Sequence, residues 1–177
     1  YAAGELVPAL ECFGAVANGT AQLGHDAAYY HTGKSEGAPF FTAFPFGFTT
    51  AEMDAWIKFG NGQKLWDELY APFGIRAFHA GSTGTQMLGW FRNEIRSLDD
   101  LKGLKFRAPG NQGRVLAKLG VTPVTLPGGE IFPALQSGAI DAAEWIGPYN
   151  DLALGFYQVC KHYYSPGYHE PGPNLQL

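Results

Sequence analysis

The chain has 177 residues, a length that suits one domain or two small lobes. Hydrophobic residues make up 46% and charged residues only 16%, a balance that predicts a packed core and excludes a disordered tail or a coiled coil. The formal net charge is −4 at pH 7, and Lys and Arg form no cluster, which argues against a nucleic-acid partner.

Several sequence features bear on the cellular setting. No apolar run approaches the roughly 18 residues that a membrane span requires, so we expect a chain that does not itself cross a bilayer. No signal peptide is present, and we expect the chain to be a fragment of a longer parent. Cys12 and Cys160 lack metal-ligand spacing, which favours two separate buried thiols, with a disulfide as the alternative.

The first part of the chain predicts mainly helices. Thr49 and Glu52 form a capping-box pattern that begins a helix ending at Phe59. Other expected elements are a helix over 6–17, a strand over 21–25, a long irregular segment over 29–48, an amphipathic helix over 62–73 and a strand over 75–80.

Strands and helices alternate in the second part. We expect strands over 87–91, 104–108, 121–126, 140–145 and 157–164, with the 121–126 strand at a sheet edge, and helices after Ser97 and over 111–119, 130–137 and 148–156. This alternation predicts an α/β fold with a largely parallel sheet flanked by helices. Ligands of such sheets bind beyond the carboxyl ends of the strands.

Arg107 is the leading candidate for ligand binding. It lies at the end of a predicted strand, directly before a predicted helix. A guanidinium there can hold a carboxylate with two hydrogen bonds, and the helix amino terminus adds positive potential. The alternative is a solvated surface arginine.

Four further positions suggest a cation or ligand site. Glu144 and Trp145 end another predicted strand, although a glutamate there is more often a structural ion pair. Gln86 ends a loop of small polar residues, and its amide oxygen suits a hard cation, although a surface glutamine is the simpler interpretation. Glu170 carries the same ambiguity. No pair of histidines has metal-ligand spacing, and no nucleophile elbow occurs.

The combined motifs resemble the solute receptors of tripartite ATP-independent periplasmic (TRAP) transporters, nearly end to end. The most specific segments are Lys105–Gly110 (KFRAPG) and Ala134–Trp145 (ALQSGAIDAAEW), supported by Pro45–Gly47 (PFG) and Gly120–Val124 (GVTPV). The closest resemblance is to the branch that binds 2-oxoacids and related monocarboxylates.

The resemblance implies a two-lobed periplasmic-binding-protein fold with parallel or mixed sheets. Residues 1–80 would form part of the first lobe, 81–165 the second, and 166–177 a segment crossing back. Arg107 would hold the ligand carboxylate. A Na⁺ or Ca²⁺ ion bound by Gln86, Glu144, the Trp145 backbone and Glu170 would bridge ligand and protein. Tyr29 or Tyr30 and Phe46 would form an aromatic wall.

The implied function is that of a periplasmic receptor, without enzymatic activity, that delivers a small carboxylate such as pyruvate or lactate to the TRAP membrane subunits. The full-length parent could form a homodimer. Two alternatives come from other functional classes: a metal-dependent hydrolase or lyase that uses Glu144 or Glu170 as a base, and the ligand-binding domain of a sensor.

Overall fold

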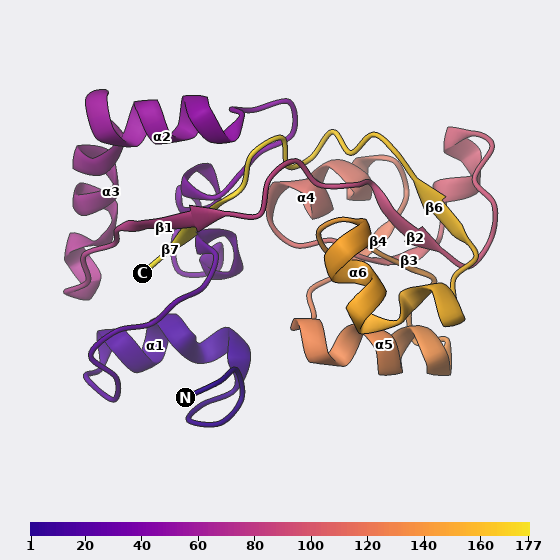
Figure 1. The fold of residues 1–177 in the computed structure, drawn as a ribbon, viewed down its shortest axis with the longest axis horizontal. Helices are drawn as coiled ribbons and strands as arrows, with labels where there is room; N and C mark the ends of the chain where they lie inside the picture. Colours follow the sequence, from indigo (N-terminus) through magenta and orange to yellow (C-terminus); the bar gives the residue numbers. More distant parts are fainter. The chain divides into compact units, whose positions relative to one another are not determined.

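The computed structural model describes residues 1–177, which form two compact units (Figure 1). Unit 1 comprises Tyr1–Ala43, Gly47–Gly84 and Gly172–Leu177, and unit 2 comprises Phe44–Phe46 and Thr85–Pro171. Both units combine helices with a sheet, so the fold class is α/β, as predicted. None of the helices is long and apolar enough to cross a membrane.

Unit 1 contains three α-helices and a two-stranded sheet. The helices are α1 (Cys12–Ala17), α2 (Thr50–Phe59) and α3 (Gly62–Tyr70), with 3₁₀ turns at Ala9–Glu11, Ala28–His31, Ala38–Phe41 and Ala71–Phe73. Strand β1 (His79–Ser82) pairs antiparallel with β7 (Asn174–Gln176). The capping box of α2 is confirmed, with the Thr49 amide donating to Glu52 Oε2 at 2.8 Å.

Three expectations for unit 1 are corrected. The first helix is regular only from Cys12, after the 3₁₀ turn that follows Pro8. The segment 21–25 is not a strand, because it has no strand beside it to pair with. Only the neighbouring Asp26 makes an isolated bridge, to Gln176. The strand expected over 75–80 begins at His79, where β7 supplies its partner.

An aromatic cluster fills the core of unit 1. The Phe41 ring stacks against Trp56 and Trp66, with centroids 5.4 and 5.0 Å away. Met53 and Tyr70 are buried beside them. Because α2, α3 and the 3₁₀ turn at Ala38–Phe41 all contribute rings, the segment predicted to be irregular is anchored to the helices by side-chain packing.

Unit 2 is built on a five-stranded mixed sheet in the order β4-β3-β5-β2-β6. Its strands are β2 (Gly89–Phe91), β3 (Lys105–Arg107), β4 (Thr122–Val124), β5 (Ala142–Ala143) and β6 (His162–Tyr164). Helices α4 (Gly110–Lys118), α5 (Gly128–Ser137) and α6 (Pro148–Leu154) flank the sheet, with 3₁₀ turns at Leu98–Leu101 and Phe156–Gln158 (Figure 1).

The predicted largely parallel sheet is only partly correct. Strands β4, β3 and β5 run parallel, and β4 lies at the edge as expected. Strand β2 pairs antiparallel with both β5 and β6.

Both cysteines are free thiols, Cys160 buried and Cys12 half-buried.

The two faces of the sheet carry separate hydrophobic clusters. Phe91, Phe106 and Ala142 pack on one face with Leu116 of α4. The opposite face packs Ala143 and Trp90 with residues of α5 and α6. Side chains alternate along a strand, so Arg107, next to Phe106 and paired in register with Ala143, belongs to this second face.

Candidate functional site

Arg107 is a buried arginine fixed by several acceptors. Its residue is only 1% exposed, so the interpretation as a surface arginine is wrong. The Nε atom donates to the Leu126 carbonyl at 3.0 Å, and Nη1 donates to the carboxylate and the carbonyl of Glu144. The guanidinium carbon lies 5.2 Å from the centre of the Trp145 ring, within cation–π range. The head group is therefore held in one orientation.

Close packing between the end of β3 and the start of α4 determines the position of Arg107. Strand β3 ends at Arg107, and Pro109 directly precedes α4. In the first turns of α4, a Cβ on Gly113 would lie 2.5 Å from the Ala108 carbonyl oxygen, so only glycine lets the helix approach the strand end this closely. The Phe-Arg-Ala-Pro-Gly sequence thus produces a tight strand-to-helix turn with the guanidinium beside it.

Three ionisable side chains gather beside Arg107 within unit 2. Glu144, His169 and Glu170 are all buried, and each offers a ligand atom within 4.8 Å of the others. The distance from His169 Nε2 to Glu144 Oε2 is 3.6 Å, too long for a hydrogen bond. Glu144 Oε2, Glu170 Oε2 and both ring nitrogens of His169 lack hydrogen-bond partners. Such buried orphan atoms are costly unless something binds them.

The charges in this cluster do not balance. Burial, reinforced by the neighbouring Glu144 carboxylate and opposed by Arg107, raises the pKa of Glu170 well above its ordinary value. A single guanidinium faces two carboxyl groups, so an ionised Glu170 requires a further positive charge, from the His169 ring or from a bound cation.

The segments carrying Gln86 and Glu170 are joined by their backbones. The Gln86 amide donates to the Glu170 carbonyl at 3.1 Å, and the Gln86 residue is only 3% exposed, so it is not a surface glutamine. Trp145 follows Glu144 in the chain, and its ring packs against Gly128 at the start of α5. The structure thus brings Gln86, Arg107, Glu144, Trp145 and Glu170 into unit 2 on connected segments.

The predicted aromatic wall has members in different units. Phe46 belongs to unit 2, where its amide donates to the Tyr168 carbonyl at 2.8 Å and its side chain is largely exposed (residue 84%). Tyr29 and Tyr30 belong to unit 1, with their rings edge to face and centroids 4.7 Å apart. A role for these rings in ligand binding stays a prediction.

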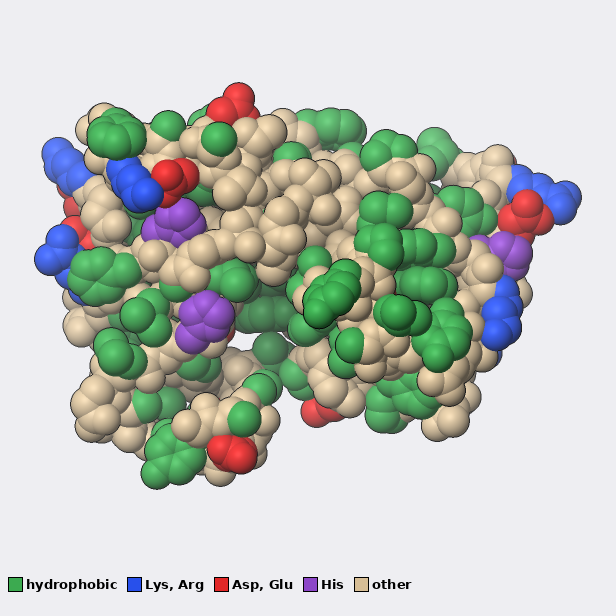
Figure 2. All heavy atoms as spheres, viewed as in Figure 1, with side chains coloured by type: hydrophobic (Ala, Val, Ile, Leu, Met, Phe, Trp, Pro, Cys, Tyr) green, Lys and Arg blue, Asp and Glu red, His purple; other side chains and the backbone are tan.

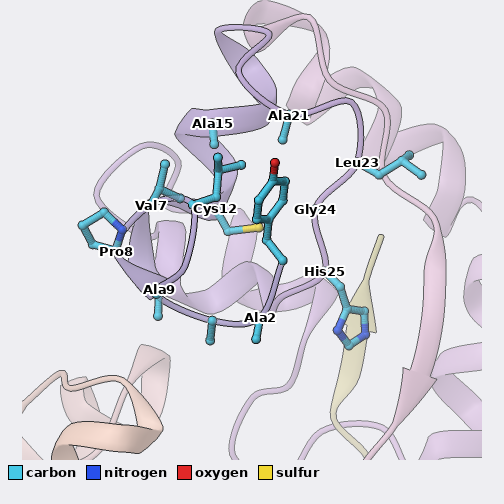
Figure 3. A pocket seen from close by; sticks show the side chains of 14 residues that line it. Ala2, Val7, Pro8, Ala9, Cys12, Ala15, Ala21, Leu23, Gly24 and His25 are labelled. Carbon is cyan, nitrogen blue, oxygen red and sulfur yellow. The ribbon is translucent and has the colours of Figure 1, made fainter.

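A cavity of about 410 Å³ in unit 1 offers different chemistry. Figure 3 shows its lining, which includes Val7, Pro8, Cys12 and Leu23, with His25 at one side. No Lys or Arg lines it, so this cavity provides no charged fork for a carboxylate. On the molecular face in Figure 2, Lys and Arg side chains appear only in small separate groups, several beside acidic side chains.

His169 and Gln112 are two of the buried polar residues that the sequence patterns do not assign to the site. His169 precedes the candidate ligand Glu170 in the chain, but only the fold brings it to Glu144. Gln112 lies in the first turn of α4, and neither its amide oxygen nor its nitrogen has a hydrogen-bond partner. The adjacent Glu170 is the sequence signal that marks His169, and no comparable signal marks Gln112.

Comparison with known proteins decides the family. A model of the bacterial extracellular solute-binding protein family 7 (DctP) matches residues 1–176. The chain belongs to this family. The monocarboxylate 2-oxoacid-binding periplasmic protein of Nostoc sp. PCC 7120 is 51% identical over 177 residues, which cover 100% of this chain and 49% of that relative.

Two solved structures of TRAP solute-binding proteins are also similar. A TRAP periplasmic solute-binding protein from Pseudoalteromonas atlantica, with bound sodium and pyruvate, is 48% identical with a TM-score of 0.92, covering 95% of this chain and 51% of that protein. A TRAP transporter solute-binding protein from Bordetella bronchiseptica is 44% identical with a TM-score of 0.97, covering 99% and 52%. The latter is a dimer in which one site holds copurified calcium and picolinate and the other is apo. The chain thus spans about half the length of these relatives.

Proposed function

We propose that this protein is an extracytoplasmic solute receptor that binds a small 2-oxo or 2-hydroxy carboxylate through Arg107 and a bridging cation. The observation that carries the proposal is the buried guanidinium facing the carboxyl groups of Glu144 and Glu170. Because burial in protein strengthens ionic contacts, one arginine in this setting can bind a small anion that has little apolar surface.

The side chains fit a hard cation. Carboxylate, amide and backbone carbonyl oxygens are the ligands that Ca²⁺ and Na⁺ use, and Glu144, Glu170, Gln86 and the Trp145 carbonyl supply this set. Glu144 Oε2 and Glu170 Oε2 are buried without hydrogen-bond partners, as expected of atoms that bind an ion. His169 is a further potential ligand. When bound, the cation would supply positive charge at which the ligand oxygens can be held.

Charge also explains why the anion and the cation should bind together. With a monocarboxylate present and Glu170 ionised, three carboxylates face the Arg107 guanidinium. A divalent cation would cancel this excess negative charge and a monovalent cation would halve it. We therefore expect carboxylate affinity to depend on the cation, and by linkage cation affinity to depend on the carboxylate.

The ligands bound in the similar structures support a chelating ligand. Pyruvate carries a keto oxygen beside its carboxylate, and picolinate carries a ring nitrogen in the equivalent position. Both can offer two atoms to one cation, which acetate cannot do in the same way. We infer that the site selects acids with a donor atom on the carbon next to the carboxylate.

The family and the site favour transport over the alternatives. Family 7 is a family of solute-binding proteins, which argues against a metal-dependent hydrolase or lyase. We propose that the receptor acts in the periplasm and delivers its ligand to the TRAP membrane subunits. A homodimer is proposed from the dimeric Bordetella bronchiseptica relative. The sensor-domain alternative would use the same pocket with a different partner.

Isothermal titration with pyruvate, in the presence of Ca²⁺ and after its removal with a chelator, tests the proposal on the full chain. We expect binding that requires the cation and that weakens by more than about tenfold, or 1.4 kcal/mol, in Arg107→Ala. Lactate and 2-oxobutyrate should bind in the same manner and acetate should not. If no 2-substituted acid binds, or if Arg107→Ala retains wild-type affinity, the proposal is wrong.

A further inference from the structure

We propose that Asp151 is a positioning residue for the cation site, because its carboxylate fixes the Ile146–Gly147 turn that follows Trp145. This inference rests on the proposed function, since it assigns the Trp145 carbonyl to the cation. Asp151 belongs to α6 and is absent from the group of residues expected to bind the ligand or the ion.

The Asp151 carboxylate is buried and accepts four hydrogen bonds. The residue is 1% exposed. Oδ1 accepts from the amides of Ile146 and Gly147, at 3.0 and 3.1 Å. Oδ2 accepts from Trp90 Nε1 at 2.9 Å and from the Tyr163 hydroxyl at 3.1 Å. This one side chain therefore ties the turn after β5 to strands β2 and β6.

The network continues from this turn to the other proposed ligands. The Ile146 peptide donates through its amide to Asp151 and accepts through its carbonyl from the Met87 amide, at 3.0 Å. Met87 follows Gln86, whose own amide donates to the Glu170 carbonyl. Backbone hydrogen bonds thus join the segment of Trp145 to that of Gln86, and the segment of Gln86 to that of Glu170. Asp151 anchors the segment that carries Trp145.

A purely structural helix cap explains this arrangement less well. One oxygen that accepts from the Ile146 and Gly147 amides would suffice to close the turn before α6, and an asparagine could supply it without the cost of a buried charge. Only an ionised carboxylate accepts at both oxygens from four donors while donating nothing. The Asp151 carboxylate holds the backbone directly after Trp145, so it would orient the Trp145 carbonyl without touching the metal.

The test is Asp151→Asn in the full chain, with Ca²⁺ and pyruvate titrated separately by calorimetry. Asparagine keeps an oxygen for the two turn amides, but its NH₂ group would face the Trp90 N–H donor. Because two donors cannot share this contact, the side chain should move and displace the turn, and we expect Ca²⁺ affinity to fall by about 10–100-fold, as is typical when a group that orients a metal ligand is lost. At saturating Ca²⁺, pyruvate affinity should return to within about threefold of wild type, a difference below 1 kcal/mol. A general loss of stability would not produce this split.

Two further variants, Tyr163→Phe and Asp151→Glu, serve as controls for Asp151→Asn. Tyr163→Phe removes one donor to Oδ2 and leaves the bonds to the turn, so Ca²⁺ affinity should stay within about twofold, well under the 1.4 kcal/mol of a tenfold change. Asp151→Glu keeps the charge, provides a folded alternative if the asparagine variant unfolds, and should weaken Ca²⁺ binding because its carboxylate is displaced by one methylene.

The outcomes separate this inference from the proposed function. Cation-dependent pyruvate binding in the wild type, with unchanged Ca²⁺ affinity in Asp151→Asn or Asp151→Glu, would overturn the role of Asp151 alone. An equal loss of Ca²⁺ affinity in Tyr163→Phe would overturn it too, because the effect would then be general loosening. Pyruvate binding that needs no cation in the wild type would instead refute the cation site of the proposed function.

Discussion

At the scale of single residues, the central feature is an arginine that is fully enclosed by protein. The guanidinium of Arg107 is fixed by Leu126, Glu144 and Trp145, so its orientation is set before any ligand arrives. Preorganisation reduces the entropy lost on binding, which matters for a ligand with few atoms. The position of Arg107 at the end of a strand marks it as a candidate ligand-binding residue, but its burial becomes evident only in the folded structure.

Replacement of Arg107 by lysine tests whether geometry or charge dominates. Lysine keeps the positive charge but cannot provide two parallel N–H donors, so we expect pyruvate affinity to fall by at least about tenfold. The exposed Arg96, which pairs with Glu94, is the control, and Arg96→Lys should leave affinity unchanged. Wild-type calorimetric affinity in Arg107→Lys would show that charge alone suffices.

At the scale of elements, the start of α5 supports the ring that lies over Arg107. A Cβ on Gly128 would come within 2.5 Å of the Trp145 ring, whereas a Cβ on the adjacent Gly129 would meet nothing within 4 Å. The first turn of this helix therefore sets the position of Trp145, although neither glycine contributes a side chain to the site.

This difference predicts opposite results for two neighbouring substitutions. Gly128→Ala should displace the Trp145 ring and weaken pyruvate binding by several-fold, because the ring no longer supports Arg107. Gly129→Ala should keep wild-type affinity and add about 0.5–1 kcal/mol of stability, the usual helical preference of alanine over glycine. Calorimetry and chemical denaturation check both variants, and equal affinities in the two would contradict this role of the helix.

The capping box of α2 gives a second prediction at this scale. Thr49→Ala should lower the free energy of unfolding by about 1 kcal/mol. Hydrogen bonds from the Thr49 amide and hydroxyl lower the pKa of the exposed Glu52. Their stabilisation is fully present above the ordinary pKa of 4.5 and is lost as pH falls through the lower folded-state pKa. The difference in unfolding free energy between Thr49→Ala and the wild type should therefore narrow at low pH, and a difference independent of pH would contradict this coupling.

Features of this chain that depend on neighbouring residues are predictable from the sequence, whereas features that depend on distant partners are not. The box at Thr49 and the strand end at Arg107 depend on neighbouring residues, and both were predicted. The absent strand at 21–25 and the antiparallel pairing of β2 depend on which strand lies alongside. His169 was missed for the same reason, because its proximity to Glu144 exists only in the folded chain.

At the scale of the whole molecule, ligand, cation and stability should be thermodynamically linked. A cation that binds only the folded protein stabilises it, by about 2.7 kcal/mol at a concentration 100 times its dissociation constant. We expect Ca²⁺ removal to lower the unfolding midpoint of the wild type and to have a smaller effect in Glu170→Gln. Thermal scans with and without a chelator measure this. An identical Ca²⁺ effect in both proteins would remove Glu170 from the proposed site.

The most direct measurement is a crystal structure of the full chain grown with pyruvate and Ca²⁺. The predicted result is the pyruvate carboxylate on the Arg107 guanidinium, with calcium bound by Gln86, Glu144, Glu170 and the Trp145 carbonyl, and with the Asp151 hydrogen bonds intact. Pyruvate bound away from Arg107, or calcium bound without contact to Glu144 and Glu170, would contradict the proposed site.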